Sequence, residues 1–333
     1  MKTVFKEVLG IDLPTPLPRM TYSEAMERYG TDKPDTRFGL EIRDLTEAVR
    51  GCGFAVFSSA VESGGTVRAI TAENAADVLT RKEIDKLSEF VKGIGAKGLA
   101  WARLTSDGVS SPFAKFLTEQ QMDALLSAAQ AKTGDAVLIV ADTVKDNALA
   151  ALGALRLEVA NRLSIERGGH SLLWIVEFPF FEWDNEQNRY VAMHHPFTCP
   201  TDRSVQYLET APERVFAKAY DLVMNGIELA SGSIRITDEG LQKQMFKALG
   251  LSEQQAHERF GFLTDAFKYG VPPHGGLGIG LDRLVMQLLG ASTLRDVVAF
   301  PKVQNMVELM TGCPSPVDAE QLEELGIRVI DKE

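Results

Sequence analysis

Two acidic residues, Asp221 and Glu228, flank the dipeptide Asn225-Gly226 in an otherwise apolar stretch. Asn-Gly between two apolar runs predicts a β-hairpin, because both residues tolerate the positive φ of a type I′ turn. If the residues on either side of the turn pair with each other, Asp221 faces Ala230 and lies diagonally from Glu228 on the same face. We therefore expect the two Cβ atoms to lie within about 8 Å of each other.

Two carboxylates on one face of a hairpin suggest a specific chemistry. Without a lysine beside them in the sequence, they suit a divalent cation that also holds phosphate oxygens, as Mg²⁺ does. The alternative is that Asp221 and Glu228 form the solvent-facing polar side of an edge hairpin. The two residues alone leave both interpretations open.

A third charged residue, Arg235, follows on the second strand of this hairpin. Its guanidinium could hold a carboxylate through two parallel hydrogen bonds. Because Glu228 and Arg235 are separated by an odd number of positions, a regular strand would put them on opposite faces. They can share a site if Ala230–Gly232 contains a β-bulge, which Gly232 favours. Otherwise Arg235 is a surface residue.

Two adjacent histidines, His194 and His195, are expected at the end of a strand. Adjacent strand residues point to opposite faces, so at most one imidazole reaches a given pocket. The pair therefore cannot bind one tetrahedral metal ion without distortion. The alternative is a histidine that is packed or at the surface.

A glycine-rich run, Gly275–Gly280, precedes Asp282 and Arg283. It is not a dinucleotide fingerprint, because Leu281 stands where the third glycine of that pattern should be, and no phosphate-binding G-K-[ST] is present. The run could let a flat ligand approach the backbone closely, and Arg283 near a helix start could meet phosphate together with free N–H groups. Close packing of helix and strand explains the glycines equally well.

The elements that must position these residues follow from apolar periodicity and from helix-start patterns. Capping boxes are expected at Thr21–Glu24, Thr80–Glu83, Thr118–Gln121 and Ser252–Gln255. Strands are expected at Gly53–Ala60, Thr66–Ala72, Gly98–Leu104, Ala136–Ala141, Leu172–Phe181, Tyr190–His194, Ala217–Met224 and Ile227–Ile236. Longer helices are expected at Asp146–Leu163 and Leu284–Leu289. Turns, not helices, separate the last four strands, which predicts an antiparallel sheet in an α+β fold.

The composition of the 333 residues is that of an ordinary globular protein, with 45% hydrophobic and 24% charged residues. No apolar stretch reaches the roughly 18 residues of a membrane span and the N-terminus lacks a signal-peptide core, so we expect a cytoplasmic protein. Cys52, Cys199 and Cys313 stand far apart, which argues against a zinc knuckle or a disulfide framework. Because the net charge is −11, any contact with nucleic acid needs a local basic patch.

Three ordered motifs resemble the class II aminoacyl-tRNA synthetases, in particular the bacterial aspartyl type. Gly278–Arg283 resembles their motif 3, whose arginine contacts the γ-phosphate of ATP. Ala192–Thr198 and Asn225–Ile236 resemble segments specific to the aspartyl enzymes. The resemblance implies a partial antiparallel-sheet catalytic core made of residues 1–37 and 144–313, an inserted α+β domain of the GAD type at 38–143, and a C-terminal extension at 314–333.

The resemblance also implies roles for individual residues. His194 and Arg235 would bind L-aspartate, with Arg235 on its side-chain carboxylate, and Asp221 and Glu228 would hold Mg²⁺. Glu228 and Arg283 would be the catalytic residues. The residues implied for ATP binding are Glu228, Gly280, Leu281, Asp282 and Arg283.

The implied reaction is ATP-dependent formation of aspartyl-adenylate and transfer of aspartate to tRNA-Asp, or to both tRNA-Asp and tRNA-Asn, by a homodimer. Motifs 1 and 2 and the anticodon-binding domain of the family are not found in this sequence, so we expect a fragment that is inactive alone. One alternative is a non-catalytic module that binds aspartate, ATP or a partner. Another is kinship with the B subunit of a tRNA-dependent amidotransferase, which Gly278–Arg283 opposes because that subunit lacks motif 3.

Overall fold

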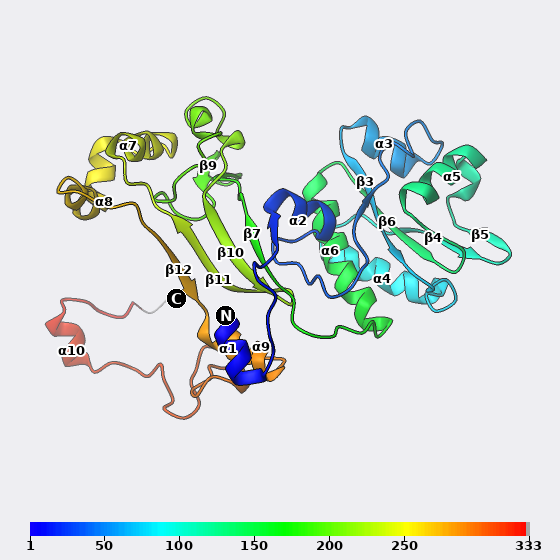
Figure 1. Cartoon of the computed structure of the whole chain (residues 1–333). Helices are drawn as coiled ribbons and strands as arrows, with labels where there is room; N and C mark the ends of the chain where they lie inside the picture. Colours follow the sequence, from blue (N-terminus) through cyan, green and yellow to red (C-terminus); the bar gives the residue numbers. More distant parts are fainter. Residues whose placement is uncertain (331–333) are drawn as a thin grey trace. The chain divides into compact units, whose positions relative to one another are not determined.

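The computed structural model describes residues 1–330, which form two compact units. The larger unit holds Asp12–Ile279, and the smaller one combines Thr3–Ile11 with the chain from Gly280 onward. Figure 1 labels the helices and strands of both units. Helices and largely antiparallel sheets occur together, so the predicted α+β class is confirmed.

A five-stranded sheet carries the candidate site and lies in the larger unit. Its strand order is β1-β7-β10-β11-β12, and every pair is antiparallel except β1 with β7. The predicted antiparallel sheet is therefore confirmed, with one parallel pair at its edge. The strands are β1 Arg19–Thr21, β7 Leu172–Val176, β10 Ala219–Met224, β11 Ile227–Ile234 and β12 Gly275–Ile279.

A second five-stranded sheet occupies the sequence between β1 and β7. It has the order β2-β3-β6-β4-β5 and is antiparallel throughout. Its strands are β2 Arg43–Asp44, β3 Thr66–Ala72, β4 Ala100–Thr105, β5 Gly108–Ser110 and β6 Ala136–Asp142. All five fall inside the range 38–143 that was expected to be an inserted domain, and the identity of that domain stays a prediction.

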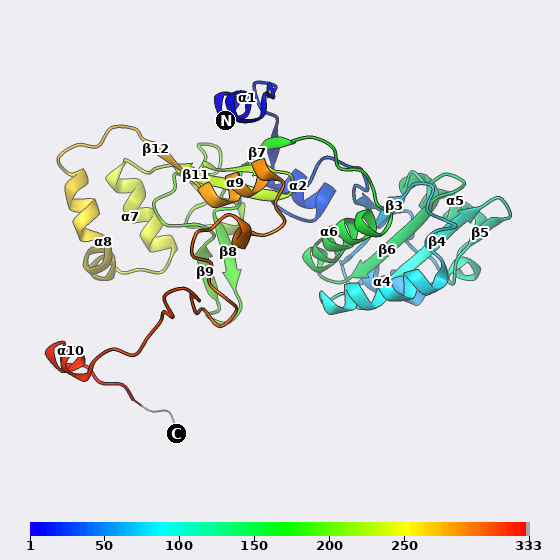
Figure 2. The same cartoon turned by 90° about the horizontal axis from the view of Figure 1, so that it is seen from below.

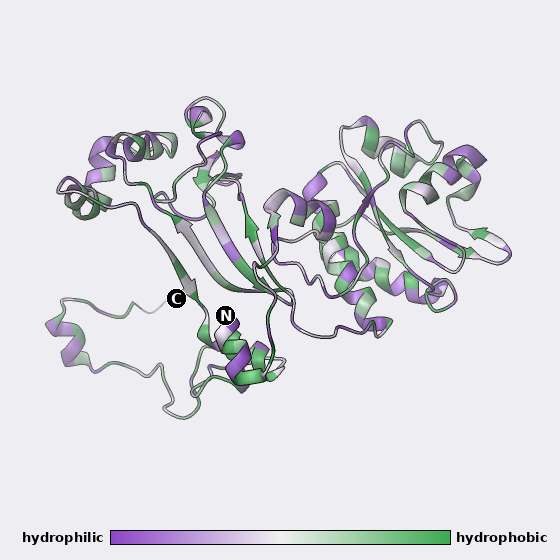
Figure 3. Cartoon of the chain, in the orientation of Figure 1, coloured by the Kyte–Doolittle hydropathy of each residue, from purple (hydrophilic) through white to green (hydrophobic). Residues whose placement is uncertain are grey.

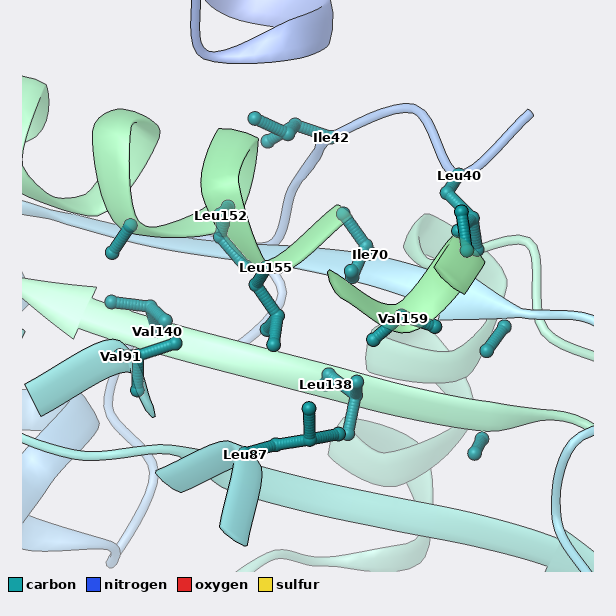
Figure 4. Close-up of a cluster of buried hydrophobic side chains, with 14 of the residues drawn as sticks. Leu40, Ile42, Ile70, Leu87, Val91, Leu138, Val140, Leu152, Leu155 and Val159 are labelled. Carbon is teal, nitrogen blue, oxygen red and sulfur yellow. The ribbon is translucent and has the colours of Figure 1, made fainter. Parts of the chain in front are cut away.

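Two apolar clusters pack on the two faces of this second sheet. On one face, α4 (Arg81–Gly93) and α6 (Lys145–Arg162) cover β3 and β6, and Figure 4 shows Leu155 and Val159 of α6 close to Leu138 of β6. On the other face lie α3 (Ala55–Glu62) and α5 (Glu119–Ala128). Because both faces are covered, the central strands β3 and β6 are buried along nearly their whole length.

The predicted strand at Gly53–Ala60 is wrong, because the segment forms helix α3. Its apolar residues Phe57, Ala60 and Val61 are three and four positions apart and are buried, whereas Val56 is exposed. That spacing is the helical repeat, which a short apolar run conceals. The strands predicted at Thr66–Ala72, Gly98–Leu104 and Ala136–Ala141 are confirmed as β3, β4 and β6.

The predicted helix starts are confirmed, although only two of the four capping boxes close completely. Thr118 and Ser252 each exchange both hydrogen bonds with the glutamine three residues later. Thr21 and Thr80 accept the backbone N–H three residues later, but the side chain of Glu24 pairs with Arg28 instead of returning to the cap. These caps begin α2 (Tyr22–Tyr29), α4, α5 and α8 (Glu253–Phe267).

The chain leaves the first sheet and returns to it at almost the same point. The hydroxyl groups of Thr36 and Ser171 lie 2.7 Å apart, although 135 positions separate them. The buried guanidinium of Arg156 in α6 donates to the carbonyl oxygens of Asp35, Phe38 and Gly39. Burial lowers the pKa of Arg156 to about 10. These contacts fix the outgoing chain against α6.

The remaining elements surround the first sheet or belong to the smaller unit. The hairpin of β8 (Phe181–Asp184) and β9 (Arg189–Ala192) and the helices α7 (Glu239–Ala248) and α8 belong to the larger unit. Figure 2 shows α7 and α8 side by side, and Figure 3 shows hydrophilic stretches on α7. The smaller unit contains α1 (Lys2–Leu9), α9 (Leu281–Leu289) and α10 (Ala319–Glu324), and it buries Phe5, Leu284 and Met286.

Candidate active site on the hairpin of β10 and β11

The Asn225-Gly226 turn forms as predicted. Both residues have positive φ, 53° and 85°, and Met224 pairs with Ile227. The backbone N–H of Ser171 donates to Asn225 Oδ1 at 2.9 Å. Asn225 therefore closes its own turn and also fixes the start of the neighbouring strand β7.

The register of β10 against β11 shifts at Leu229, an extra residue on β11. Beyond this bulge Asp221 faces Ser231, so the prediction that it faces Ala230 is wrong. The bulge also lies just before Ala230, not within Ala230–Gly232 as expected. The side chain of Leu229 is only 1% exposed.

The bulge decides which charged residues share a face. Because alternation restarts after the extra residue, Glu228 falls on the same face as Ser231 and Asp221. Continued past the end of β11, the same alternation brings Arg235 to that face. A bulge therefore brings Glu228 and Arg235 to the same face, as expected. It lies at Leu229 and not within Ala230–Gly232.

Asp221 is a buried carboxylate on strand β10. It is 5% exposed, and its Oδ1 has no hydrogen-bond partner within residues 1–330. Burial raises the pKa of Asp221, a hydrogen bond from Ser231 lowers it, the negative charge of Glu228 raises it further and His194 lowers it. A buried carboxylate oxygen without a partner is costly in free energy, which is a common property of a ligand-binding atom.

Arg235 lies against His195, not against a carboxylate. Its Nη1 is 2.6 Å from His195 Nε2, and no ion pair of its guanidinium occurs within the described chain. Burial lowers the pKa of His195, and the positive charges of Arg235 and His194 lower it further. The arrangement presents a cation whose charge is not neutralised by a neighbouring carboxylate.

The ring of His194 packs edge-on against Phe178 with centroids 5.1 Å apart. Strand β9 ends at Ala192, two residues before His194, so strand alternation does not apply to the two histidines. The expectation that at most one of them reaches a given pocket stays a prediction. His195 contacts Arg235, and the electrostatic effect of His194 opposes the rise in the pKa of Asp221.

The glycine-rich run is divided between strand β12 and helix α9. In β12, Gly276 and Gly278 pair with Ser233 and Ser231 of β11, and the strand is exposed along its length. Gly280 is the N-cap of α9, whose first turn consists of Leu281, Asp282 and Arg283. Since α9 belongs to the smaller unit, the role of these four residues in ATP binding stays a prediction.

Neither a protein metal cage nor a membrane-spanning helix occurs in residues 1–330. Histidine, cysteine, aspartate and glutamate side chains form no group of three that could hold a metal ion there. No helix in the described chain is long and apolar enough to cross a bilayer. Any cation at Asp221 and Glu228 would therefore need oxygen ligands from a substrate or from water as well.

Comparison with known proteins assigns the family. A family model described as tRNA synthetases class II (D, K and N) matches residues 1–304. The chain belongs to this family. The antiparallel sheet of this class II chain carries the hairpin described above, so the predicted partial catalytic core is confirmed at the level of the family.

The curated relatives of this class II chain include ligases specific for aspartate. It is 52% identical over 335 residues to an aspartate–tRNA ligase of Clostridium perfringens, and 53% identical over 335 residues to that of Clostridium acetobutylicum. It is 51% identical over 334 residues to an aspartate–tRNA(Asp/Asn) ligase of Bacillus cytotoxicus. These matches cover 100% of the chain but 56% of each relative, so the chain spans about half their length.

Solved structures resemble this class II chain less closely. An aspartyl-tRNA synthetase from Entamoeba histolytica covers 73% of the chain at 19% identity, with a TM-score of 0.34, and the chain covers 44% of it. The site is therefore described from the residues of this chain alone.

Sequence reasoning assigns no role to three polar residues around Arg235, namely His195, Thr198 and Ser233. Thr198 and Ser233 are 1% and 2% exposed. A signal for His195 is present, because Pro196 follows it and argues against a continuing strand. Strand alternation puts Ser233 on the side of Arg235, whereas Thr198 carries no local signal, since only the tertiary fold brings it to Ser233.

Proposed function

We propose that this chain supplies part of the active site of an aspartate–tRNA ligase, which joins aspartate to ATP as aspartyl-adenylate and then transfers aspartate to tRNA. The observation that carries the proposal is the bulge at Leu229, which brings Asp221, Glu228 and Arg235 to one face of the hairpin. The identity of about 52% to aspartate–tRNA ligases supports it.

Arg235 is the residue proposed to bind the side-chain carboxylate of aspartate. A guanidinium binds a carboxylate through two parallel hydrogen bonds, and that geometry distinguishes aspartate from its uncharged amide. The imidazole beside Arg235 leaves its positive charge available. His194, whose electrostatic effect reaches Asp221, is proposed to contact the amino acid as well.

Asp221 and Glu228 are proposed to hold Mg²⁺ together with the phosphates of ATP. The buried Oδ1 of Asp221 fits this role because Mg²⁺ prefers oxygen ligands and binds through one or two carboxylates plus substrate phosphates. When bound, the ion would neutralise part of the phosphate charge. Glu228 would orient the complex from the same face. Gly280–Arg283, in the smaller unit, are proposed to bind ATP because they resemble the family motif, through backbone N–H groups and the Arg283 guanidinium.

The wider properties of the reaction are part of the same proposal. The acceptor would be tRNA-Asp, or tRNA-Asp and tRNA-Asn as in the name of the Bacillus cytotoxicus relative. The working form would be a homodimer in the cytoplasm. Because the chain spans about half the length of its relatives, we propose that it binds substrates but does not complete adenylation alone.

Calorimetry tests the proposal directly. Aspartate should bind the purified chain, and Arg235→Ala should weaken binding at least about 10-fold, because one charged bidentate contact is lost. Arg50→Ala, which removes an exposed arginine in the turn between β2 and α3, is the matched control and should bind like the parent chain. Equal binding by Arg235→Ala would refute the assignment of Arg235.

Exchange of labelled pyrophosphate into ATP separates the possible states of the chain. We expect no aspartate-dependent exchange from the chain alone. Exchange at a rate typical of a synthetase would contradict the fragment interpretation. Binding of both aspartate and ATP with no exchange, even when the missing family segments are added as a second polypeptide, would favour the non-catalytic binding module.

A further inference from the structure

A buried glutamine, Gln242, connects helix α7 to the histidine turn, the segment His194–Phe197. Its side chain is 4% exposed, and its Nε2 donates to the carbonyl oxygen of Pro196 at 2.9 Å. A carbonyl oxygen can only accept a hydrogen bond, so this contact fixes which end of the side-chain amide faces the turn. Gln242 therefore serves the histidine turn as a hydrogen-bond donor.

The accepting carbonyl belongs to the peptide group that also holds the ring of His195. In this group the backbone N–H of Phe197 donates to His195 Nδ1 at 3.2 Å. A peptide group is planar, so its C=O and its N–H move together. A displacement of the Pro196 carbonyl would therefore displace the N–H that holds the imidazole. Arg235 Nη1 lies against the same imidazole, 2.6 Å from Nε2 and 3.3 Å from Nδ1.

The chain that follows Arg235 holds the histidine turn a second time. The backbone N–H of Ile236 donates to the carbonyl oxygen of Phe197 at 2.9 Å. The ring of Phe197 also packs against Phe246 of α7 and Phe260 of α8, with centroids 6.2 and 5.1 Å apart. Two consecutive carbonyls of the turn thus accept hydrogen bonds from the stretch of chain that begins at Arg235.

The other end of the amide of Gln242 does not stabilise the fold. Its Oε1 is buried and has no hydrogen-bond partner within residues 1–330, which is unfavourable in free energy. Met245 and Phe246, three and four positions later, are buried on the same face of α7. An apolar side chain at position 242 would continue this face without an unsatisfied oxygen. The donor to Pro196 is therefore the favourable contribution of the amide.

We propose that Gln242 is a positioning residue that holds the histidine turn beside Arg235 and thereby sets the arrangement of the groups that bind the amino-acid substrate. This inference rests on the proposed function of Arg235 and His194. It goes beyond that function because Gln242 lies on α7, outside the hairpin, and acts through the Pro196–Phe197 peptide group.

Calorimetry on a matched pair of variants of α7 tests this role. Gln242→Met keeps the length of the side chain but removes the donor, so aspartate binding should weaken about 5- to 10-fold, as for the loss of one hydrogen bond. Binding of ATP with Mg²⁺ should stay within about 2-fold, because the turn is proposed to serve the amino acid. Gln244→Met, at an exposed position of the same helix, should bind both ligands like the parent chain.

Unfolding and nitrogen NMR separate positioning from a purely structural role. The urea midpoint of Gln242→Met should stay within about 0.5 M of the parent value, because removal of the unsatisfied oxygen offsets part of the lost hydrogen bond. In histidine-labelled chain without ligand, the ring signals of His195 should shift in Gln242→Met and not in Gln244→Met. The signals are assigned by their loss in His195→Gln. Unchanged His195 signals in Gln242→Met would overturn the inference.

The two proposals fail in different ways. If the parent chain does not bind aspartate, or if Arg235→Ala binds it equally well, the proposed function fails and the His195 signals alone decide whether Gln242 holds the turn. If binding depends on Arg235 but Gln242→Met binds aspartate like the parent chain, the positioning role is wrong while the proposed function stands.

A purely structural role of Gln242 has its own signature. Aspartate and ATP binding would then weaken equally, and the urea midpoint would fall by more than about 1 M. That combination would also overturn the positioning role. If Gln242→Met does not fold, Gln242→Leu, which is shorter and also lacks the donor, takes its place in each measurement.

Discussion

Asp221 lies opposite Ser231 across the hairpin, yet its buried carboxylate oxygen Oδ1 has no hydrogen-bond partner in the described chain. The fold therefore keeps a buried charge that it does not fully satisfy. Such an atom lowers stability and is retained where binding of a ligand compensates for the cost.

Replacement of this carboxylate should stabilise the chain while impairing its function. Asp221→Asn removes the buried charge, so the free energy of unfolding without metal at neutral pH should rise by about 1 kcal/mol. Binding of ATP with Mg²⁺ should weaken. Urea unfolding and calorimetry measure the two effects, and Glu89→Gln on the exposed face of α4 serves as a control. A loss of stability in Asp221→Asn would contradict the picture of an unsatisfied charge.

The glycines of β11 and β12 can be separated into packing and ligand-facing positions. A Cβ at Gly232 would overlap the carbonyl oxygen of Gly276 and approach Tyr220 Cε2 at 2.7 Å. Gly232→Ala should therefore cost about 2 kcal/mol or more of stability. Nothing lies within 4 Å of a Cβ at Gly276, so Gly276→Ala should change stability by less than about 0.5 kcal/mol.

The same pair tests whether a flat ligand approaches β12. If ATP stacks on the backbone of this strand, Gly276→Ala should weaken ATP binding with an unchanged melting temperature. Thermal unfolding and calorimetry on the same sample measure both. Unchanged ATP affinity in Gly276→Ala would leave helix and strand packing as the reason for these glycines.

The lowered pKa of His195 gives stability a defined pH dependence. Burial and the charges of Arg235 and His194 bring the pKa of this ring below its ordinary value of 6.5. Between the two values the unfolded chain binds more protons than the folded chain, so stability falls as pH falls through this window. The change in unfolding free energy from about pH 8 to about pH 5.5 should be smaller in His195→Gln. Equal changes in both proteins would contradict a neutral ring.

Arg156 is expected to be among the most sensitive positions of the larger unit. Its guanidinium is 1% exposed and donates to three carbonyl oxygens of the chain that leaves the first sheet. Arg156→Met should cost about 3 kcal/mol, because these carbonyls lose their donors in a buried site. Arg50→Ala should change stability by less than about 0.5 kcal/mol. Chemical denaturation of both variants provides the comparison.

Local signals predicted the parts of the site that depend on neighbouring residues. Asn225-Gly226 forms its turn because both residues accept positive φ, and Ser252 caps α8 because its partner is three residues away. Both effects act within a few residues of the chain. The sequence is sufficient for features of this kind.

Features that depend on tertiary packing could not be predicted in this way. The bulge lies at Leu229, three positions before the glycine that favours a bulge in the sequence. The contact of His195 with Arg235 joins residues 40 positions apart. The sequence predicts a strand where helix α3 forms, because a short apolar run fits both periods until its buried face is known.

The contact between Thr36 and Ser171 bears on how this chain acquires its structure. The segment between them contains a complete sheet with its own two apolar clusters, while β1 and β7 on either side pair directly. Closing a loop of that length costs little if the segment has already folded with its ends together. We therefore expect the second sheet to bring two distant ends of the synthetase sheet together during folding, so that destabilising it slows the assembly of the first sheet.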